Sequence, residues 1–309
     1  MITIKQMRYF DALAQARHFG RAAQLVHVSQ PALSAQIMDL EAALGVKLVE
    51  RNRSRILLTR DGEALLPRIQ HILAQVAELE QASQHKHGPL SGVARIGAIP
   101  TVAPYLVPKL VPYLRAVYPR IEIELREATT YKLLLELEEG RLDAVVAALP
   151  VAGDGLSVRP LLKDRFYMAV AETSRDVLAS PLTGAAIDPG RLLLLEEGHC
   201  LRDQALEVCS AARPNTVINI SATSMTTLLQ MVNHDLGITL VPEMALDAEV
   251  SHHRLRVVPF APPVPAREIG LIWRRSNPDI ADIDALAEAI IATTPHVEND
   301  APVVNRDSA

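Results

Sequence analysis

Apolar and polar positions in the first 45 residues alternate with the period of amphipathic helices. One helix is predicted over residues 4–17, and its apolar stripe consists of Ile4, Met7, Phe10, Leu13 and Ala14. A second, short helix follows Phe19-Gly20, with an inward side made of Ala22, Ala23, Leu25 and Val26. Because alanine side chains are small, a further helix can pack closely against this side.

A third helix has clear start and stop signals. Ser29 is a typical N-cap, Pro31 stands in the first turn where no helical N–H is lost, and Gly45 marks the end. One face of this helix is apolar and consists of Leu33, Ile37, Leu40 and Leu44. The pattern therefore predicts three consecutive helices, of which the third keeps a polar face.

That polar face carries short hydrogen-bonding side chains, Gln30, Ser34 and Gln36. Side chains of this kind read base edges when the N-terminus of a helix enters the major groove of DNA. The following segment, VKLVERNRSRILLTRDG, predicts two strands around a turn at residues 52–54. Arginines 51, 53 and 55 gather near its tip, where they suit phosphate or minor-groove contact. The alternative is a small helical bundle with a polar helix and a basic hairpin.

The distribution of charge supports the DNA-binding interpretation of this segment. Residues 1–60 contain nine Lys and Arg against four Asp and Glu, whereas the rest of the chain contains 22 against 32. Only the N-terminal segment is therefore suited to a polyanionic partner. The whole chain has a net charge of −5 and 49% hydrophobic residues, which is typical of a folded protein of two or three domains at this length of 309 residues.

A long helix is predicted from residue 61 to about residue 84. Its apolar residues step by four and three positions, as in a coiled coil; they are Leu65, Ile69, Ile72, Val76 and Leu79. We expect this seam to pair two chains and so place two reader helices on one DNA, although an amphipathic helix can also pack on its own chain. Gly88 and Pro89 end it, and His85 and His87 next to them lack the partners of a metal site.

Beyond residue 88, short apolar strands alternate with amphipathic helices, as in VARIGAIP, PYLVPKLVPYLRAVYP, RIEIELREA and TYKLLLELEEG. This alternation predicts βαβ units in a mostly parallel sheet, and the length fits two α/β lobes. The sequence contains no P-loop, GxSxG or HExxH motif, so we expect neither an enzyme nor a cofactor or metal site. The doublet His252-His253 is expected on the surface.

The two cysteines of the chain lie nine positions apart, in LLLLEEGHCLRDQALEVC. Cys200 is expected where a strand gives way to a helix, so the helix N-terminus and a cation such as Arg202 favour its thiolate, whereas Glu196 and Glu197 oppose it. If one helix joins Cys200 to Cys209, their Cα atoms lie about 13 Å apart, and a disulfide needs about 5.5 Å. The two thiols can pair only if this segment unwinds, which would make oxidation a conformational switch.

The run FGRAAQLVHVSQPALSAQIMDLEAALGVKLVER resembles the helix-turn-helix signature of LysR-type transcription regulators. The resemblance implies a winged helix-turn-helix over residues 1–60, a linker and dimerisation helix over 61–87, and a sensing domain over 88–309 with two α/β lobes like those of periplasmic binding proteins. The expected DNA-binding residues are Ser29, Gln30, Pro31, Ser34, Gln36, Arg51 and Arg53. The family also implies promoter DNA and RNA polymerase as partners, and a dimer of dimers.

The phrase GHCLRDQALEVC, with IPTVAPYLVPKL upstream and AREIGL downstream, resembles the peroxide-sensing members of that family. The resemblance implies that hydrogen peroxide oxidises Cys200, that Cys209 resolves the product as a disulfide, and that glutathione or glutaredoxin reverses it. The residues implied around the peroxide are Thr101, Thr130, His199, Asp203 and Arg267. The two threonines can instead cap helices, and Arg267 can instead pair with a surface acid.

Two other functions remain open from the sequence. One is a LysR-type regulator that binds a small anionic metabolite between the lobes and has idle, structural cysteines. The other is a solute-binding module, which would need no basic helical N-terminus. The chain shows no apolar stretch long enough to span a membrane and no secretory signal at its start, so we expect a cytoplasmic protein.

Overall fold

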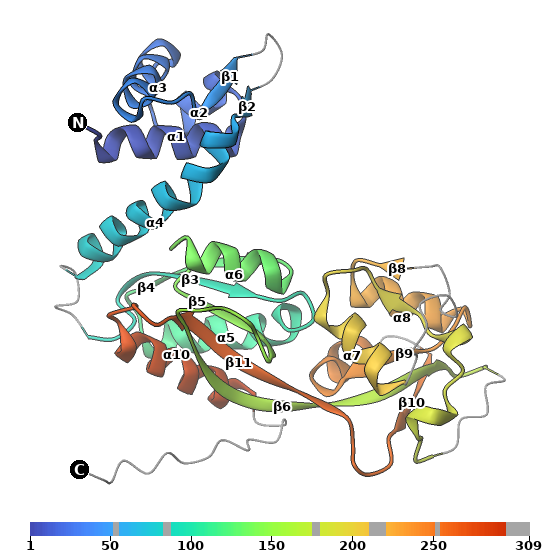
Figure 1. Ribbon diagram of the computed structural model, residues 1–309. Helices are drawn as coiled ribbons and strands as arrows, with labels where there is room; N and C mark the ends of the chain where they lie inside the picture. Colours follow the sequence, from blue (N-terminus) through green and yellow to red (C-terminus); the bar gives the residue numbers. More distant parts are fainter. Residues whose placement is uncertain (52–55, 83–87, 175–179, 210–220, 251–253, 295–309) are drawn as a thin grey trace. The chain divides into compact units, whose positions relative to one another are not determined.

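The computed structural model describes residues 1–51, 56–82, 88–174, 180–209, 221–250 and 254–294. It divides the chain into two units, Met1–Lys86 with Glu138–Arg141, and His87–Leu137 with Leu142–Ala309 (Figure 1). The first unit contains the elements α1 (Ile4–Ala16), α2 (Phe19–Leu25), α3 (Gln30–Leu44), β1 (Val49–Arg51), β2 (Ile56–Leu58) and α4 (Arg60–Ala82). The three short helices, the strand pair and the long helix all agree with the sequence pattern.

The helix boundaries follow the local signals in the sequence. The Ser29 hydroxyl accepts a hydrogen bond from the Ala32 amide, Pro31 lies in the first turn, and Gly45 ends α3 with a φ of 73°. A capping box of Thr3 and Gln6 starts α1. These caps satisfy amides and carbonyls that a helix end leaves without partners.

The core of the first unit is made by the predicted apolar faces, with Phe10, Leu13, Leu33, Ile37 and Leu40 fully buried. Two expected inward residues are exceptions, since Ile4 is 38% exposed and Leu25 is 60% exposed. Both lie at the end of a helix, where the periodic pattern continues although no neighbouring element covers it. The prediction that they face inward was therefore wrong.

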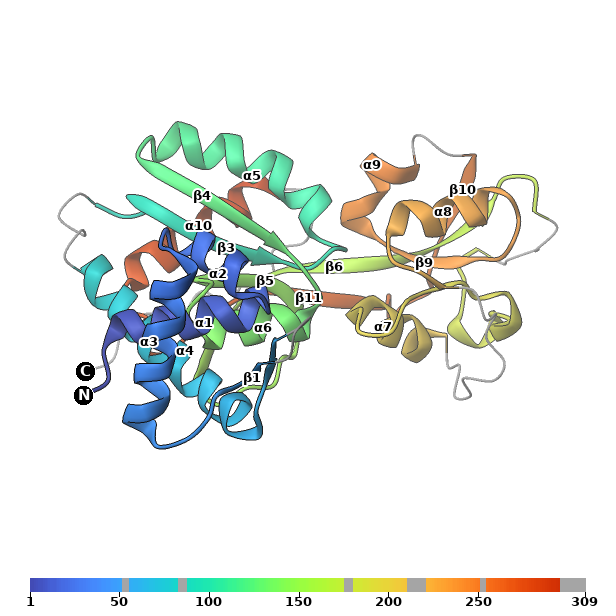
Figure 2. The same cartoon turned by 90° about the horizontal axis from the view of Figure 1, so that it is seen from above.

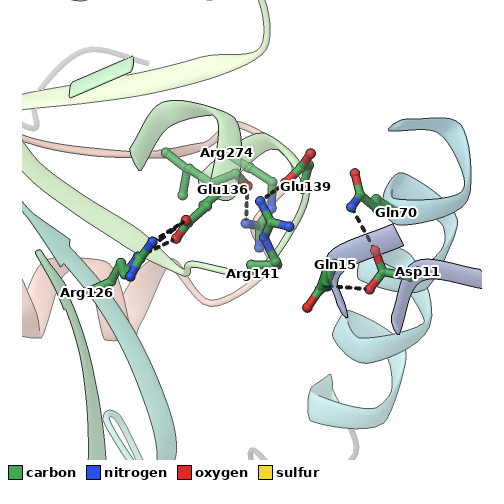
Figure 3. Close-up of polar contacts among 9 residues, drawn as sticks. Asp11, Gln15, Gln70, Arg126, Glu136, Glu139, Arg141 and Arg274 are labelled. Carbon is green, nitrogen blue, oxygen red and sulfur yellow. Dashed lines mark hydrogen bonds and ion pairs between the residues drawn. The ribbon is translucent and has the colours of Figure 1, made fainter. Parts of the chain in front are cut away.

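The apolar seam of α4 does not form one continuous face. Ile69 is buried in the core of its own unit, whereas Ile72 and Leu79 are exposed. Polar contacts also hold α4 to α1, because Asp11 accepts hydrogen bonds from Gln70 at 2.7 Å and from Gln15 at 2.8 Å (Figure 3). Part of the expected pairing seam thus packs within its own chain, and only its other members remain available to a second copy.

The second unit is built on a seven-stranded sheet with the order β10-β6-β11-β5-β3-β4, in which β9 also pairs with β6. The strands of this unit are β3 (Gly92–Ala98), β4 (Ile121–Glu127), β5 (Ala144–Leu149), β6 (Leu156–Ala171), β7 (Leu194–Leu195), β8 (Ser221–Ala222), β9 (Thr239–Pro242), β10 (Leu255–Pro259) and β11 (Ala266–Arg274). Its α-helices are α5 (Ala103–Val117), α6 (Thr130–Glu138), α7 (Cys200–Val208), α8 (Met225–Asn233), α9 (Leu246–Glu249) and α10 (Ile280–Thr293). Three-residue 3-10 turns occur at η2 (Gly184–Ala186), η3 (Pro189–Arg191) and η5 (Glu243–Ala245).

Two lobes share this sheet. In the first lobe, α5 and α10 cover one face of the sheet and α6 covers the other (Figure 1). The second lobe contains α7, α8 and α9 around β9 and β10, with its own apolar core. Figure 2 shows β6 and β11 running side by side from one lobe into the other.

The expectation of a mostly parallel sheet is correct only for β3, β4 and β5 of the seven-stranded sheet, and for the short separate pair of β7 and β8. β3 pairs in parallel with β4 and β5, but β11 runs antiparallel to β5 and β6, and β9 and β10 run antiparallel to β6. The difference arises because the chain passes between the lobes twice, and β11 returns along β6 in the opposite direction. A βαβ pattern describes neighbours along the chain and does not reveal such a return.

A buried carboxylate joins the end of α3 to the strand pair of the first unit. Glu41 is 3% exposed and accepts hydrogen bonds from the amides of Leu48 at 2.9 Å and Val49 at 3.4 Å, and from Lys47 Nζ at 2.8 Å. Burial alone would raise the pKa of Glu41, but Lys47 and the two amides outweigh it and hold the pKa below its ordinary value.

Replacing Glu41 should loosen the strand pair without removing α3. We expect Glu41→Ala to destabilise the first unit by about 2–3 kcal/mol, because two buried amides lose their acceptor. Since the pKa of Glu41 is lower in the folded state, its contribution is complete above the ordinary value of 4.5 and is lost as the pH falls through the folded value. Hydrogen exchange at the Leu48 and Val49 amides measures the effect. The exposed Glu50→Ala is the control, and equal exchange in both variants would contradict the assignment.

Candidate functional site

The first turn of α3 presents a polar surface to solvent. Gln30 and Pro31 are exposed and Ser34, one turn further, is half-buried. Ser29 is exposed as well, but its hydroxyl oxygen is engaged in capping the helix. Gln36 lies off this line and donates to Asp39 at 3.3 Å. Of the predicted reading residues, Gln30 and Ser34 are thus aligned one turn apart.

The predicted basic tip lies mostly outside the described residues. Arg51 is the last residue of β1, and the structure describes its backbone but not its side chain. Arg53 and Arg55 belong to residues 52–55, which are not described. The expected phosphate contacts of this wing remain a prediction.

Cys200 is the first residue of α7, as the sequence predicted for the step from strand to helix. The chain leaves β7, turns at Gly198 with a φ of 92°, and enters α7 through His199 as the N-cap residue. A positive φ of this size favours glycine, which explains the Gly-His-Cys order. The Cys200 side chain is half-buried and packs against the core of the first lobe, although α7 belongs to the second lobe.

A small pocket lies at the Cys200 side chain; the space between its lining residues is about 170 Å³ with the adjoining open solvent included, and it leaves no room for a separate water-sized molecule. It is lined by Ile99, Pro100, Thr101, Thr129, Thr130, Gly198, His199 and Cys200. The first five residues come from the turns after β3 and before α6 in the first lobe, and the last three come from the start of α7 in the second. The ion pair of Arg126 and Glu136, at 3.2 Å, joins β4 to α6 and helps to place that helix (Figure 3).

Arg267 lies behind the pocket and holds Thr101 in place. Its Nη1 donates to Thr101 Oγ1 at 2.8 Å, and its Nη2 donates to the Thr101 carbonyl at 2.9 Å. Its Nε donates to Asp164 at 2.8 Å, and both charged side chains are fully buried. The alternative that Arg267 pairs with a surface acid is therefore wrong. Neither Arg267 nor its partner Asp164 lines the pocket itself.

The environment of Cys200 acts on its pKa in opposite directions. Burial raises the pKa of the thiol above its ordinary value, while the charge of Arg267, the Leu201 amide and the Thr130 hydroxyl lower it. The cation that acts on Cys200 is therefore Arg267 and not Arg202, which the sequence had suggested. Arg202 instead donates to the Leu195 carbonyl at 3.0 Å.

The hydroxyl groups of Thr101 and Thr130 do not cap helices. Thr101 is buried, and its hydroxyl oxygen accepts from Arg267, so its own O–H hydrogen remains to be donated elsewhere. Thr130 Oγ1 is buried and makes no hydrogen bond of ordinary geometry with the described residues; the group it faces is the Cys200 sulfur. Burial lowers the pKa of the half-buried His199 side chain, against an opposing effect of Glu196.

Cys209 caps the other end of α7 and is only 2% exposed, in the core of the second lobe. Burial raises the pKa of its thiol to about 12. Both cysteines are free thiols, and the nine positions from Cys200 to Cys209 correspond to about 13 Å along a helix. The predicted separation of the two thiols by a helix is confirmed for the reduced protein.

The structure brings together four of the five residues implied around a peroxide. Thr101, Thr130 and His199 line the pocket and Arg267 supports it, whereas Asp203 is exposed and is not among the lining residues. Sequence reasoning missed Asp164 and Thr129. Asp164 stands between Lys163 and Arg165, so no signal in the sequence marks its side chain as buried.

Neither a metal-binding group nor a membrane-spanning helix is found among the described residues. No group of three His, Cys, Asp or Glu side chains there is arranged to hold a metal ion. His85, His87, His252 and His253 lie outside the described residues. Among the helices that are described, none is long and apolar enough to cross a bilayer.

Two sequence families match the chain. The family described as bacterial regulatory helix-turn-helix protein, lysR family, matches residues 4–63, and the LysR substrate binding domain matches residues 87–294. The DNA-binding transcriptional dual regulator OxyR of Escherichia coli K12 is 38% identical over 94% of this chain and 95% of its own. The hydrogen peroxide-inducible genes activator of Haemophilus influenzae is 37% identical over 94% and 96%.

Solved structures give the same result. A full-length OxyR variant from Pseudomonas aeruginosa superposes with a TM-score of 0.77 at 36% identity, over 94% of this chain and 98% of that one. An OxyR mutant from Corynebacterium glutamicum with bound hydrogen peroxide has a TM-score of 0.64 at 32% identity, over 94% and 92%. The two family matches together cover most of the chain, and the relatives match it over nearly its whole length. The chain therefore belongs to the LysR family of bacterial transcription regulators.

Proposed function

We propose that this regulator responds to hydrogen peroxide through Cys200 and Cys209. The observation that carries the proposal is the position of Cys200 in a small pocket lined by threonines, with the charge of Arg267 behind it. The relatives described as hydrogen peroxide-inducible activators support the same function. Promoter DNA is then the second partner, and a cytoplasmic location follows from it.

The pocket has the chemical groups that a peroxidatic thiol needs. The Cys200 thiolate attacks one peroxide oxygen, the O–O bond breaks, and the leaving hydroxide takes up a proton to become water. Thr101 can donate its O–H to a peroxide oxygen, and the positive charge of Arg267 favours both the thiolate and the leaving hydroxide. Cys200 is left as a sulfenic acid.

In the second step, the thiolate of Cys209 attacks the Cys200 sulfur. The S–O bond breaks, the departing oxygen leaves as water after protonation, and an S–S bond remains, so the two sulfurs have lost the two electrons that peroxide gained. Because a disulfide needs Cα atoms about 5.5 Å apart, α7 must unwind before it can form. A cytosolic thiol such as glutathione, or glutaredoxin, would reverse the bond by thiol-disulfide exchange.

The lining of the pocket favours peroxide over an anionic metabolite. Its residues present hydroxyl, imidazole and thiol groups but no charged side chain for an anion. A small neutral oxidant fits these properties, whereas an anionic metabolite does not.

Mass spectrometry of peroxide-treated protein tests the proposal directly. Micromolar hydrogen peroxide should oxidise Cys200 first and yield a disulfide between Cys200 and Cys209, because only Cys200 borders the pocket. In Cys209→Ser the sulfenic acid should persist, and in Cys200→Ser the buried Cys209 should stay reduced. An unmodified Cys200 in the wild-type chain would favour the metabolite alternative.

The role of Arg267 predicts a pH dependence. Because burial raises the pKa of the Cys200 thiol and Arg267 opposes this rise, Arg267→Gln should raise the pKa further. The pH at which iodoacetamide alkylates Cys200 at half its maximal rate should therefore move upward. The control is Arg256→Gln, an exposed charge on β10. An unchanged or lower midpoint in Arg267→Gln would show that the guanidinium does not act on the thiolate.

For DNA recognition, we propose that the first turns of α3 enter the major groove, with Gln30, Pro31 and Ser34 near the bases. Arg51 and Arg53 would contact the backbone, and paired chains, two dimers together, would bind the operator and act on RNA polymerase. Exposed Ile72 and Leu79 on α4 support such pairing.

A bulky side chain on the reading face should disturb specific binding. Ser34→Tyr is expected to weaken operator binding by about 10- to 100-fold but nonspecific DNA binding much less, because the latter depends mainly on phosphate contacts. Fluorescence anisotropy with operator and random duplexes measures both. Ala43→Tyr, exposed near the other end of α3, is the matched control. Equal losses on the two duplexes would place Ser34 outside the groove.

A further inference from the structure

Asp164 is a fully buried carboxylate at the point where the two lobes join. It lies on β6 directly opposite Arg267 on β11, and its exposed fraction is zero. One carboxylate oxygen accepts from Arg267 Nε at 2.8 Å, and the other accepts from the Met244 amide at 3.1 Å. Met244 follows β9 in the second lobe, so Asp164 connects that lobe to the crossover strands.

This arrangement fixes the direction of the Arg267 side chain. With Nε held by Asp164, both Nη atoms reach Thr101, one at the hydroxyl and one at the carbonyl. The guanidinium also lies over the Phe166 ring, 6.0 Å from its centre, and Nη2 is 3.6 Å from the Met244 sulfur. A buried arginine needs a compensating anion, and Asp164 is the acid bonded to it.

We propose that Asp164 is a positioning residue for the reaction of Cys200 with peroxide. It acts through Arg267 on Thr101, and it touches neither the pocket nor the thiol. This inference rests on the proposed peroxide function and adds a residue to it that the lining of the pocket does not reveal.

The direction of hydrogen bonding explains the effect. Because Thr101 Oγ1 accepts from Arg267, its hydrogen is left for a different acceptor, and a peroxide in the pocket that Thr101 lines would be one. In Asp164→Asn one carboxylate oxygen becomes an NH₂ group, which donates and cannot accept. The side chain can then no longer accept from Arg267 Nε with one atom and from the Met244 backbone amide with the other. The guanidinium then loses its anchor, and the Thr101 hydroxyl loses its fixed orientation.

A comparison of two reactions of the same thiol tests this role. In chains that carry Cys209→Ser, the rates at which hydrogen peroxide oxidises Cys200 and iodoacetamide alkylates it are measured with and without Asp164→Asn. Alkylation needs only an accessible thiolate, whereas peroxide also needs the oriented Thr101 and Arg267. We expect Asp164→Asn to lower the ratio of peroxide rate to alkylation rate by about 10- to 100-fold. A general loosening of the fold would not produce this split.

The matched control is Glu268→Gln, which removes an exposed carboxylate from the next position of β11. Its ratio should stay within about twofold of the parent chain. An unchanged ratio in Asp164→Asn, while the parent chain reacts with peroxide, would overturn the inference and leave the proposed function intact. A parent chain whose Cys200 does not react with peroxide would overturn both.

A second variant covers the case that Asp164→Asn does not fold. In Arg267→Gln chains the buried cation that Asp164 holds is gone. Adding Asp164→Asn to these chains removes the remaining buried charge, so that both side chains are neutral. Since Asp164 acts only through Arg267, this addition should change the ratio by no more than about twofold. A further loss of about tenfold in that background would show that Asp164 acts on the pocket by another route and would overturn the inference.

Discussion

The structure of the second unit depends on one buried ion pair, between Asp164 and Arg267. Two fully buried charges are costly unless each finds the other and additional hydrogen bonds. Here the additional bonds go to Thr101 in the first lobe and to the Met244 amide in the second. The pair therefore fixes the two lobes to the crossover strands at the place where the thiol pocket forms. A weaker junction would leave the pocket residues, which come from both lobes, without a common frame.

Helix α7 imposes the second constraint, because it keeps the cysteines apart. Its N-terminus places Cys200 against the core of the first lobe, and its C-terminus places Cys209 in the core of the second. A second junction lies nearby, where Tyr105 of α5 reaches into the core of the second lobe and donates to Glu249 at 3.1 Å. Glu249 also accepts from Thr226 on α8 at 3.0 Å. Under the proposed mechanism, we expect these contacts to stay in place while α7 repacks.

Local signals in the sequence predicted much of this molecule. The caps at Ser29 and Gly45, the small Ala22 and Ala23, and the step from strand to helix at Cys200 all depend on a few neighbouring residues, and the structure confirms them. The predictions that were wrong concern features that depend on residues far away in the sequence. Whether Leu25 is covered, and whether β11 returns along β6, depends on the packing of distant elements.

The functional residues divide in the same way. The two thiols, Thr101 and Arg267 could be found because each lies in a phrase that resembles the peroxide-sensing members of the family, whereas Thr129 was missed. Asp164 and Arg267 are 103 positions apart, and nothing in their own segments shows that they pair. The cation expected from the neighbouring residues was Arg202, the family resemblance implied Arg267, and the structure supplies Arg267 from β11. Electrostatic partners act through space, so periodicity cannot reveal them.

The burial of Cys209 orders the steps of the proposed reaction. With a pKa near 12 and an exposed fraction of 2%, its thiol is a poor nucleophile while α7 is folded. The attack on an oxidised Cys200 must therefore follow an opening of the helix end that exposes the sulfur to water and lowers its pKa. Oxidation of Cys200 places an additional oxygen in a pocket with little spare volume, which strains the packing around the first turn of α7. The first chemical step thus promotes the opening that the second step requires, and the helix separates detection of peroxide from commitment to the disulfide.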